Sequence, residues 1–456
     1  MERQLRWGLT FFVLIGLLGL THTGIGEAYA ETSSQAVEIE VNVIFSGPSL
    51  DAFRVLAETF EADHAGVNVV VNRPPSFIDV LFSRVKAGNP PDISLIPNPG
   101  QLREFVDGVA QYGESDLVPL DFLRQTLDEQ YMDAFVDLGT FVGPDGDARL
   151  YGLTFSANVK SLVWYNPNVL GSGFEIDTWD EMMAFTREKA AQNQTAWCIG
   201  LESGGGTGWP GTDWIEDVLM QTAGPIIYDA WVAHDIPWTD ERIKWAWELF
   251  GRIVRNPDYV LGGPEGAVGV NYQDSPNGLF TDPPGCYLHR QASFIQKAHP
   301  DLTPIEDFNV FPFPRIDASD RGRTLIGGGS ILGMFRDTPE NRDFMRFLAS
   351  AEAQEIWIER GGQESPANAE ADLRSLDPIS ERITRLLRTA EHFRYDASDL
   401  MPSALGSGAF WTQVIDFVLG KDVCAALRSL EATAERVYDA GAATNGMVED
   451  GACPAS

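Results

Sequence analysis

The sequence lacks the residue patterns with which most hydrolases and metalloproteins carry out their chemistry. Among 456 residues it has only 4 cysteines and 6 histidines, and none of them forms a CxxC or HExxH pattern. No serine stands in a GxSxG pattern either. These absences argue against a zinc site of ordinary spacing, a zinc protease and a serine hydrolase. The sequence therefore predicts no metal ion, no cofactor, no catalytic residue and no enzyme.

Basic residues are also scarce. Lys and Arg number 33 against 66 Asp and Glu, which gives a formal net charge of -33 at pH 7. A field of this sign repels phosphate backbones and anionic lipid headgroups, so we expect no nucleic-acid partner. After the first thirty residues, no apolar run is long enough to cross a membrane.

The first thirty residues have the order of a secretory signal. Arg3 and Arg6 precede an apolar run over residues 11–20, and a small-residue site ends at Ala30. This pattern predicts cleavage after Ala30 and a periplasmic protein that begins at Glu31. The alternative is an uncleaved N-terminal anchor, but the apolar run is short for a membrane helix. No cysteine follows the cleavage site, so a lipid anchor is not expected.

The rest of the chain has the size and composition of a packed protein of two domains. Its apolar content of 44% and its 12 tryptophans exclude a disordered chain. Four cysteines in an exported chain permit two disulfides, and the sequence leaves three pairings open. We favour the pairing of nearest neighbours, which joins Cys198 to Cys286 and Cys424 to Cys453.

Strands and helices alternate over the first third of the mature chain. Apolar, β-branched runs predict three strands at Ile39–Phe45, Val67–Val71 and Ile93–Ile96. Helical periodicity fills both intervals, over residues 49–60 and 77–88. This order predicts an α/β fold with a parallel sheet, because such short links require crossover helices. Ligands of these sheets bind beyond the carboxyl ends of the strands.

A second α/β region follows Tyr151. The predicted strands are Ser161–Tyr165, Thr195–Leu201, Asp307–Phe313 and Leu325–Phe335, the last interrupted by the glycines at 327–329. Thr178 and Glu181 form a capping box for a helix that reaches Ala191, and Thr239 is expected to cap the helix that carries Trp245 and Trp247. Beyond Thr338 the pattern is mostly helical, with runs at Phe344–Ala351, Ile379–Glu391 and Phe410–Tyr438.

Three carboxylates lie close together on one predicted helix: Asp213, Glu216 and Asp217. A pair of carboxylates can make a glycosidase, but neighbours on one helix seldom flank a sugar from opposite faces. We therefore expect a solvated acidic first turn that suits the helix dipole. The nearby GxGxxG pattern at 206–211 contains a proline and follows no first strand, so it predicts a plain turn.

Aromatic residues are the richer signal. Trp209 and Trp411 both follow Gly-rich loops, which is where the lining of a binding site is expected. Indole rings stack on the C–H faces of sugar rings, while Asn, Gln, Asp and His bind hydroxyl groups. The alternative for any single tryptophan is burial in the core.

From residue 41 to about 430 the chain resembles the bacterial extracellular solute-binding proteins of ABC importers. The resemblance is to the branch that includes maltose-binding and α-glucoside-binding proteins. The motifs that carry it are Pro91-Asp92-Ile93, Tyr151-Gly152-Leu153 before Ser161–Asn166, Trp197–Ser203, Gly208–Asp217, Cys286 with His289 and Gln291–Phe294, and Met401-Pro402 before Phe410-Trp411.

The resemblance implies a periplasmic binding protein of type II, with two doubly wound lobes that close over a sugar. The lobes would be 31–155 with 328–368 and 156–327 with 369–456, joined by crossings near 153–158 and 326–330. By position, the resemblance assigns ligand contacts to Gly47, Asn98, Asn158, Trp209, Asp213, His289, Gln291, Gly328 and Trp411. The expected partners are a carbohydrate and the transmembrane subunits of an ABC permease, and the receptor is expected to be a monomer.

The function that follows is capture of an α-glucoside or a related di- or trisaccharide for an ABC importer. Two alternatives remain, a secreted glycoside hydrolase and a binding protein for a non-sugar solute. Pro99 stands where maltose-binding proteins carry a ligand-binding acid. The resemblance therefore does not imply strict maltose specificity.

Overall fold

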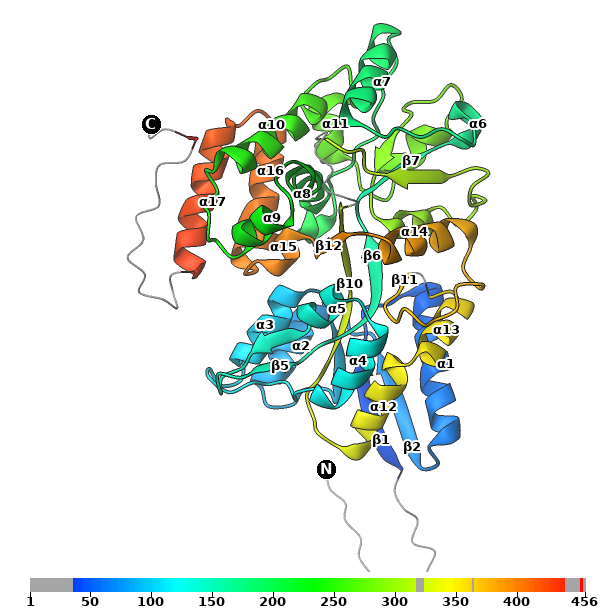
Figure 1. Ribbon diagram of the computed structural model, residues 1–456, viewed down its shortest axis with the longest axis vertical. Coiled ribbons are helices and arrows are strands. Elements are labelled where there is room, and N and C mark those ends of the chain that lie inside the picture. The colour runs from blue at the N-terminus through cyan, green and yellow to red at the C-terminus, as the bar shows by residue number, and fades with distance from the viewer. Residues whose placement is uncertain (1–35, 317–323, 363–364, 439–451, 454–456) are drawn as a thin grey trace, which may run out of the picture. The chain divides into compact units, whose positions relative to one another are not determined.

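The computed structural model describes residues 36–316, 324–362, 365–438 and 452–453 (Figure 1). The predicted signal sequence and its cleavage site at Ala30 lie outside the described residues. The chain divides into two units, 1–36 and 37–456, and the second carries all the helices and strands described below. Within the described residues, no helix combines the length and apolar character needed to cross a bilayer.

The first three strands form the parallel arrangement that the sequence predicts. β1 (Val37–Asn42) pairs in parallel with β2 (Val67–Asn72) on one side and with β3 (Ile93–Ile96) on the other. The crossover helices are α1 (Gly47–Asp63) and α2 (Phe77–Lys86). β3 has the predicted bounds because an unbroken apolar run fits a strand that is buried on both faces.

Three strands from later in the sequence extend this sheet beyond β3, and a fourth strand pairs with one of them. Its order is β11-β6-β10-β3-β1-β2, with β6 at Leu153–Val159, β10 at Thr324–Met334 and β11 at Ser365–Pro366. β10 is antiparallel to both β3 and β6, and its first residues pair in parallel with β12 (His392–Tyr395). Both predicted crossings therefore lie on paired strands, and β12 is a further strand that the sequence analysis missed.

The expected interruption of β10 at its three glycines is wrong. Gly327–Gly329 continue the strand and pair with Ala157–Val159 of β6. A β carbon on Gly327 or Gly329 would overlap the backbone carbonyl oxygens of β6. Glycine here permits close pairing of the two strands rather than breaking one of them.

A second, smaller sheet lies beyond β6. β7 (Leu162–Tyr165) pairs antiparallel with β8 (His289–Arg290) and β9 (Asn309–Pro312). The predicted strand over residues 195–201 is wrong, since only Trp197 forms isolated bridges there, to Val260 and Leu288. Residues 195–201 form bridges only at single positions of neighbouring segments, so no continuous strand pairing extends along them.

The helix starts of this region follow their capping residues. The capping box of Thr178 and Glu181 is present at α7 (Trp179–Ala191). α10 (Glu241–Val254) begins one residue later than the expected cap, because the Asp240 carboxylate rather than Thr239 accepts the hydrogen bond from Arg242 N. A carboxylate at this position also suits the helix dipole.

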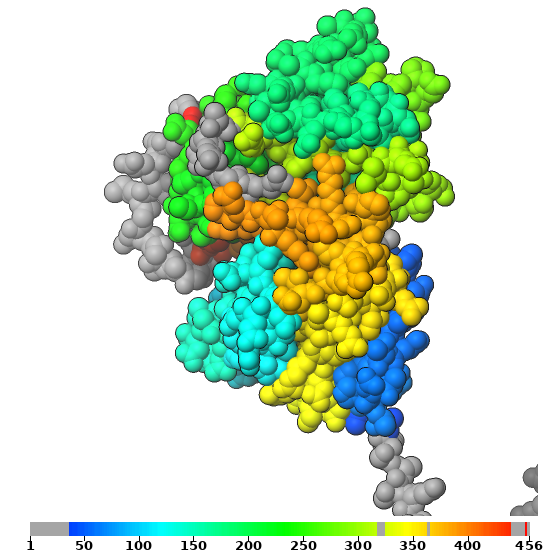
Figure 2. Space-filling view, turned by 45° about the vertical axis from the view of Figure 1, so that its right-hand side comes forward, coloured from blue at the N-terminus to red at the C-terminus, as the bar shows by residue number. Residues whose placement is uncertain are grey.

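The remaining helices connect or cover these two sheets, and two further strands pair with each other in a sheet of their own. They are α3 (Pro99–Asp107), α4 (Arg124–Gln130), α5 (Asp133–Leu138), β4 (Thr140–Val142), β5 (Ala148–Leu150), α6 (Pro167–Leu170), α8 (Trp209–Ala223), α9 (Pro225–Val232), α11 (Gly263–Gly269), α12 (Pro339–Ala349), α13 (Ala351–Glu359), α14 (Pro378–Arg388), α15 (Ala397–Leu400), α16 (Trp411–Val418) and α17 (Val423–Tyr438). Figure 2 shows the orange segment that carries α14 beside the yellow segment of α12 and α13. Ile383 of α14 joins the same buried apolar cluster as β1.

Both favoured disulfides are confirmed. Cys198 is joined to Cys286 with a Cα–Cα distance of 5.5 Å, and Cys424 to Cys453 with 5.2 Å. The first disulfide ties the loop before α8 to the segment before β8. The second ties the first turn of α17 to a residue near the C-terminus.

Candidate functional site

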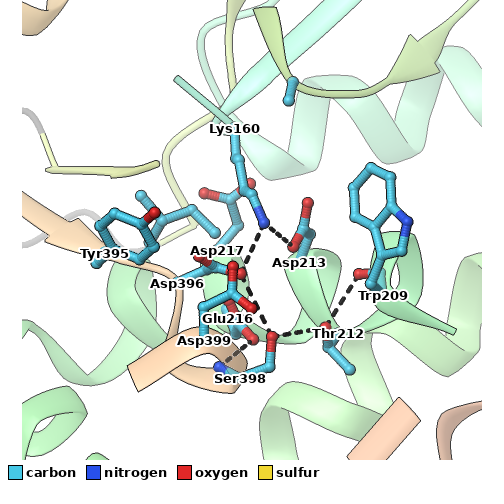
Figure 3. A network of polar contacts seen from close by, with 12 residues as sticks. Lys160, Trp209, Thr212, Asp213, Glu216, Asp217, Tyr395, Asp396, Ser398 and Asp399 are labelled. Carbon is cyan, nitrogen blue, oxygen red and sulfur yellow. Dashed lines mark hydrogen bonds and ion pairs between the residues drawn. The ribbon is translucent and has the colours of Figure 1, made fainter. Parts of the chain in front are cut away.

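A buried lysine lies where the chain leaves the large sheet. Lys160 follows β6, and its backbone N–H donates to Ile326 O of β10 at 2.9 Å. Its Nζ lies 3.0 Å from Asp213 Oδ1 of α8 and 2.6 Å from Asp396 Oδ2, just after β12 (Figure 3). Lys160 thus contacts β10 through its backbone, and its ammonium contacts α8 and the residue that follows β12.

A second cation completes the ionic contacts around α8. Arg290 of β8 donates from Nε to Asp217 Oδ2 at 2.9 Å and from Nη1 to Asp213 Oδ2 at 3.1 Å. The Ser161 hydroxyl donates to the other oxygen of Asp217. Asp213 therefore bridges Lys160 and Arg290, and both of its oxygens are engaged.

Two more carboxyl groups adjoin these contacts. Glu216 Oε1 accepts a hydrogen bond from Ser398 N at 3.1 Å, while Glu216 Oε2 is buried without a hydrogen-bond partner within the described part of the chain. Asp399 N donates to the backbone oxygen of Asp396 at 3.1 Å. The seven residues are named the Lys160 cluster: Lys160, Asp213, Glu216, Asp217, Arg290, Asp396 and Asp399.

The Lys160 cluster holds five carboxyl groups against two cationic groups, so full ionisation would leave an excess of negative charge. Burial, with the charges of Asp396 and Asp213, raises the pKa of Glu216 well above its ordinary value. Burial alone lowers the pKa of Lys160, but attraction to Asp213 and Asp396 outweighs it and holds that pKa well above the ordinary value. The cluster therefore keeps Lys160 charged and retains protons on part of its carboxyl groups.

The expectation of a solvated acidic turn at Asp213, Glu216 and Asp217 is wrong. Their exposed fractions are 0%, 0% and 1%. α8 is buried on every side over Pro210–Met220, so its carboxylates have no route to solvent. The cations that balance them lie far away in the sequence, at Lys160 and Arg290, where no local pattern connects them to the helix.

Three aromatic rings adjoin this cluster and are named the aromatic wall: Trp209, Tyr272 and Phe294. The half-buried ring of Trp209, in the first turn of α8, lies 5.0 Å from the ring of Tyr272 and 5.9 Å from that of Phe294. The ammonium of Lys160 lies 5.3 Å from the centre of the Trp209 ring. This distance is within the range of a cation–π interaction.

The two predicted aromatic residues of the site come together. A β carbon on Gly206 would lie 3.3 Å from Trp209 Cδ1 and 3.7 Å from Trp411 Cζ3. Gly208 has a φ of +114°, and a β carbon there would overlap the backbone of Trp411. The Gly-rich loop thus lets the start of α16 approach the start of α8 closely.

Two of the predicted polar residues border this group. Asn158 pairs with Gly328 across β6 and β10, and its side-chain oxygen is buried without a hydrogen-bond partner within the described residues. Asn98 caps α3 by accepting from Gln101 N, and its amide donates to Asp399 Oδ1 at 3.4 Å. The Asn98 side chain is thus linked to a carboxylate of the Lys160 cluster, while Asn158 lies on the strand that leads into Lys160.

His289, Gln291 and Gly47 are placed differently. His289 and Gln291 are each 1% exposed. His289 Nδ1 lies 2.9 Å from Cys198 O, and burial lowers the pKa of His289 to about 4. Gln291 accepts from Ala292 N. In this structure both side chains are enclosed, whereas Gly47 is exposed at the start of α1.

The carboxylates are also spaced as metal ligands would be. Oxygens of Asp213, Glu216 and Asp396 lie within 4.8 Å of one another. The ammonium of Lys160 already binds two of these three carboxyl groups. It therefore takes the place that a metal cation would occupy among them. Because all three carboxyl groups are buried and lie close to one another, they do not flank a substrate as a glycosidase pair does.

The chain belongs to the family of bacterial extracellular solute-binding proteins, whose model matches residues 46–355. Members of this family are substrate-binding receptors and not enzymes, so the hydrolase alternative receives no support. The extracellular location of the family agrees with an exported protein, and family members bind carbohydrates for ABC permeases.

Two curated relatives are similar over most of their length. The osmoprotective compounds-binding protein GgtB of Synechocystis is 39% identical over 80% of this chain and 85% of its own. The α-glucosides-binding periplasmic protein AglE of Rhizobium meliloti is 37% identical over 78% of each chain.

A solved structure shows the same fold. The bacterial solute receptor AcbH, which prefers β-D-galactopyranose, superposes with a TM-score of 0.73 at 16% identity, over 88% of this chain and 100% of its own. The fold is thus that of the periplasmic binding proteins of the maltose-binding type, as the sequence analysis predicted.

Proposed function

We propose that this chain is the periplasmic receptor of an ABC sugar importer and that it captures an α-glucoside or a related di- or trisaccharide. The observation that carries the proposal is the meeting of Trp209 and Trp411 beside Gly206. Two half-buried indole rings supply apolar faces for sugar rings, and the nearby asparagine amides supply partners for hydroxyl groups. The 37% identity to an α-glucoside-binding protein supports the same ligand class.

Capture by closure follows from this arrangement. The two lobes, 31–155 with 328–368 and 156–327 with 369–456, would rotate about β6 and β10. A ligand that contacts both lobes only in the closed state draws the equilibrium toward closure. The closed receptor then delivers the sugar to the transmembrane subunits of the permease. In this proposal the receptor is a monomer, is cleaved after Ala30 and binds no nucleic acid.

The nine predicted ligand residues take different roles in the proposal. Trp209 and Trp411 stack on sugar rings, and Asn98 and Asn158 bind hydroxyl groups. Gly47 and Gly328 offer backbone groups at the ends of their lobes. Three of the predicted residues are enclosed in the conformation described here and take a supporting role: Asp213, His289 and Gln291.

Binding should be tested by calorimetric titration of the mature protein with a panel of di- and trisaccharides, compatible solutes and polyamines. We expect one class of saccharide to bind, with release of the same unaltered sugar. Trp411→Ala should weaken its binding by about 1–3 kcal/mol, because a ring buried against ligand is lost.

Trp245→Ala is the matched control, since this indole is 42% exposed on α10 and contacts no residue of the site described above. It should leave saccharide affinity unchanged. Binding of only a non-sugar solute, or hydrolysis of the saccharide, would overturn the proposal. Equal affinities for wild type and Trp411→Ala would remove Trp411 from the site.

A further inference from the structure

The ammonium of Lys160 has one face that its carboxylate partners do not use. Two of its three N–H groups are accounted for by Asp213 and Asp396. The ring of Trp209 lies 5.3 Å away, and the Lys160 side chain is only 7% exposed. A desolvated cation near an indole ring attracts it more strongly than an exposed one.

The ammonium is the fixed partner in this contact. Asp213 is held by Arg290 on its other oxygen, at 3.1 Å. Asp396 N donates to Gly327 O at 2.9 Å, which ties its position to β10. Lys160 cannot shift without breaking contacts to β10, to α8 and to the residue that follows β12.

The indole ring is the freer partner. Trp209 is half-buried, and its other ring contacts are to Tyr272 and Phe294, which are also half-buried. Gly206, which lies between Trp209 and Trp411, adds no side chain to hold the ring. Of the Trp209 ring contacts to Lys160, Tyr272 and Phe294, the Lys160 ammonium is the enclosed and firmly held one.

We propose that Lys160 is a positioning residue of the ligand site, which holds the Trp209 ring in the orientation that stacks on ligand. This inference rests on the proposed function for the ligand, but the contact between Lys160 and Trp209 can be tested without one. Lys160 itself is enclosed and acts through the ring. If Lys160 only stabilised the fold, its removal would change the environment of Trp209 no more than that of the other tryptophans.

A double-mutant cycle separates these two roles. In saccharide titrations, Lys160→Met should weaken binding by about 2- to 30-fold, which is the range of a single cation–π contact. The same change in a Trp209→Leu background should have almost no effect, because the ring it acts through is absent. Equal losses in both backgrounds would overturn the inference while leaving the sugar-binding proposal intact.

Lys189→Met is the matched control. The Lys189 ammonium lies 4.1 Å from the ring centre of Tyr287, so this variant also removes a lysine from an aromatic face. Tyr287 is not part of the aromatic wall, and we expect unchanged saccharide affinity. A loss equal to that of Lys160→Met would show a general effect of removing a lysine and would contradict the inference.

A measurement without ligand keeps the inference testable if the receptor binds no saccharide. In protein labelled with 5-fluorotryptophan, the ¹⁹F signal that Trp209→Leu removes is assigned to Trp209. Lys160→Met should shift or broaden this signal and leave that of Trp245 in place, whereas Lys189→Met should change neither. An unmoved Trp209 signal in folded Lys160→Met protein would overturn the inference.

Removal of Lys160 takes the cation from Asp396 and leaves Asp213 with Arg290, so Lys160→Met/Asp396→Asn replaces the single variant if that variant does not fold. This pair removes one charge of each sign and keeps the cluster's net charge. The Trp209 signal should shift in the double variant but not in Asp396→Asn alone, which retains the ammonium. Identical Trp209 signals in these two proteins would contradict the inference.

Discussion

The apolar cluster around β1 and the Lys160 cluster are both buried, but they are held together by opposite kinds of side chain. Around β1 the interior is apolar, and the Trp357 ring lies 4.7 Å from that of Phe45 and 5.1 Å from that of Phe155. Around Lys160 the interior consists of carboxyl groups and two cationic side chains. Apolar packing is non-directional and insensitive to pH, whereas buried charges depend on every partner and on protonation.

Of the variants that test this difference between the two regions, Arg290→Met should have the largest effect on the free energy of unfolding. The change leaves Asp217 and Asp213 without the guanidinium, and at pH 8 it should lower the free energy of unfolding by about 3–5 kcal/mol. The loss should be smaller at pH 5. Burial already raises the pKa of Asp217, and without Arg290 this carboxyl group takes up a proton more readily as pH falls.

Urea unfolding at the two pH values measures both losses. The control is Arg103→Met, which removes an exposed ion pair between Arg103 and Asp107 on α3. Such pairs contribute about 0–1 kcal/mol, so its effect should be small at either pH. If Arg290→Met cost no more than Arg103→Met, the ionic cluster would not be a stabilising core.

Trp357→Ala is the corresponding change in the apolar region. Trp357 is 1% exposed, and loss of its ring should lower the free energy of unfolding by about 3–5 kcal/mol. The loss should be equal at pH 5 and pH 8, because no titrating group is left unpaired. Thermal unfolding at both pH values tests this, with the exposed Trp245→Ala as control. A strongly pH-dependent loss would remove the contrast between the two regions.

The smallest of these effects has the opposite sign. Glu216→Gln should raise the free energy of unfolding at pH 8 by about 1 kcal/mol, because a neutral amide avoids the cost of burying an ionisable carboxyl group whose Oε2 has no partner among the described residues. The raised pKa of Glu216 means that the folded protein holds a proton that the unfolded chain has lost above about pH 4. This contribution to stability is therefore present in full below about pH 4 and decreases as pH rises toward the folded-state pKa.

The variant should flatten this part of the pH dependence. Unfolding curves between pH 4 and pH 8 for wild type and Glu216→Gln measure it directly. Glu352→Gln, on the exposed face of α13, is the control and should keep the wild-type slope. Parallel slopes for wild type and Glu216→Gln would show that Glu216 carries no extra proton in the folded protein.

The same contrast explains what the sequence predicts well. β3 and the capping box of Thr178 and Glu181 depend on neighbours a few residues away, so local pattern is sufficient to place them. The alternating polar and buried residues of His392–Tyr395 also indicate a strand, but β12 is too short to stand out without its partner β10.

The Lys160 cluster could not be predicted in this way. Asp213 looks like an ordinary acidic residue near a helix start, and its contacts to Lys160 and Arg290 span 53 and 77 residues of sequence. The burial of α8 on every side depends on how later segments pack around it. Trp209 and Trp411 were predicted because a Gly-rich loop before an indole ring is a local signal, whereas the ammonium that contacts Trp209 is not.

The central claim, that this receptor closes around a saccharide, is tested most directly by small-angle X-ray scattering of the mature protein with and without its saccharide ligand. We expect the radius of gyration to decrease when the ligand saturates the site, and Trp411→Ala to need a higher ligand concentration for the same decrease. A radius of gyration that stays constant at saturating saccharide would contradict the account.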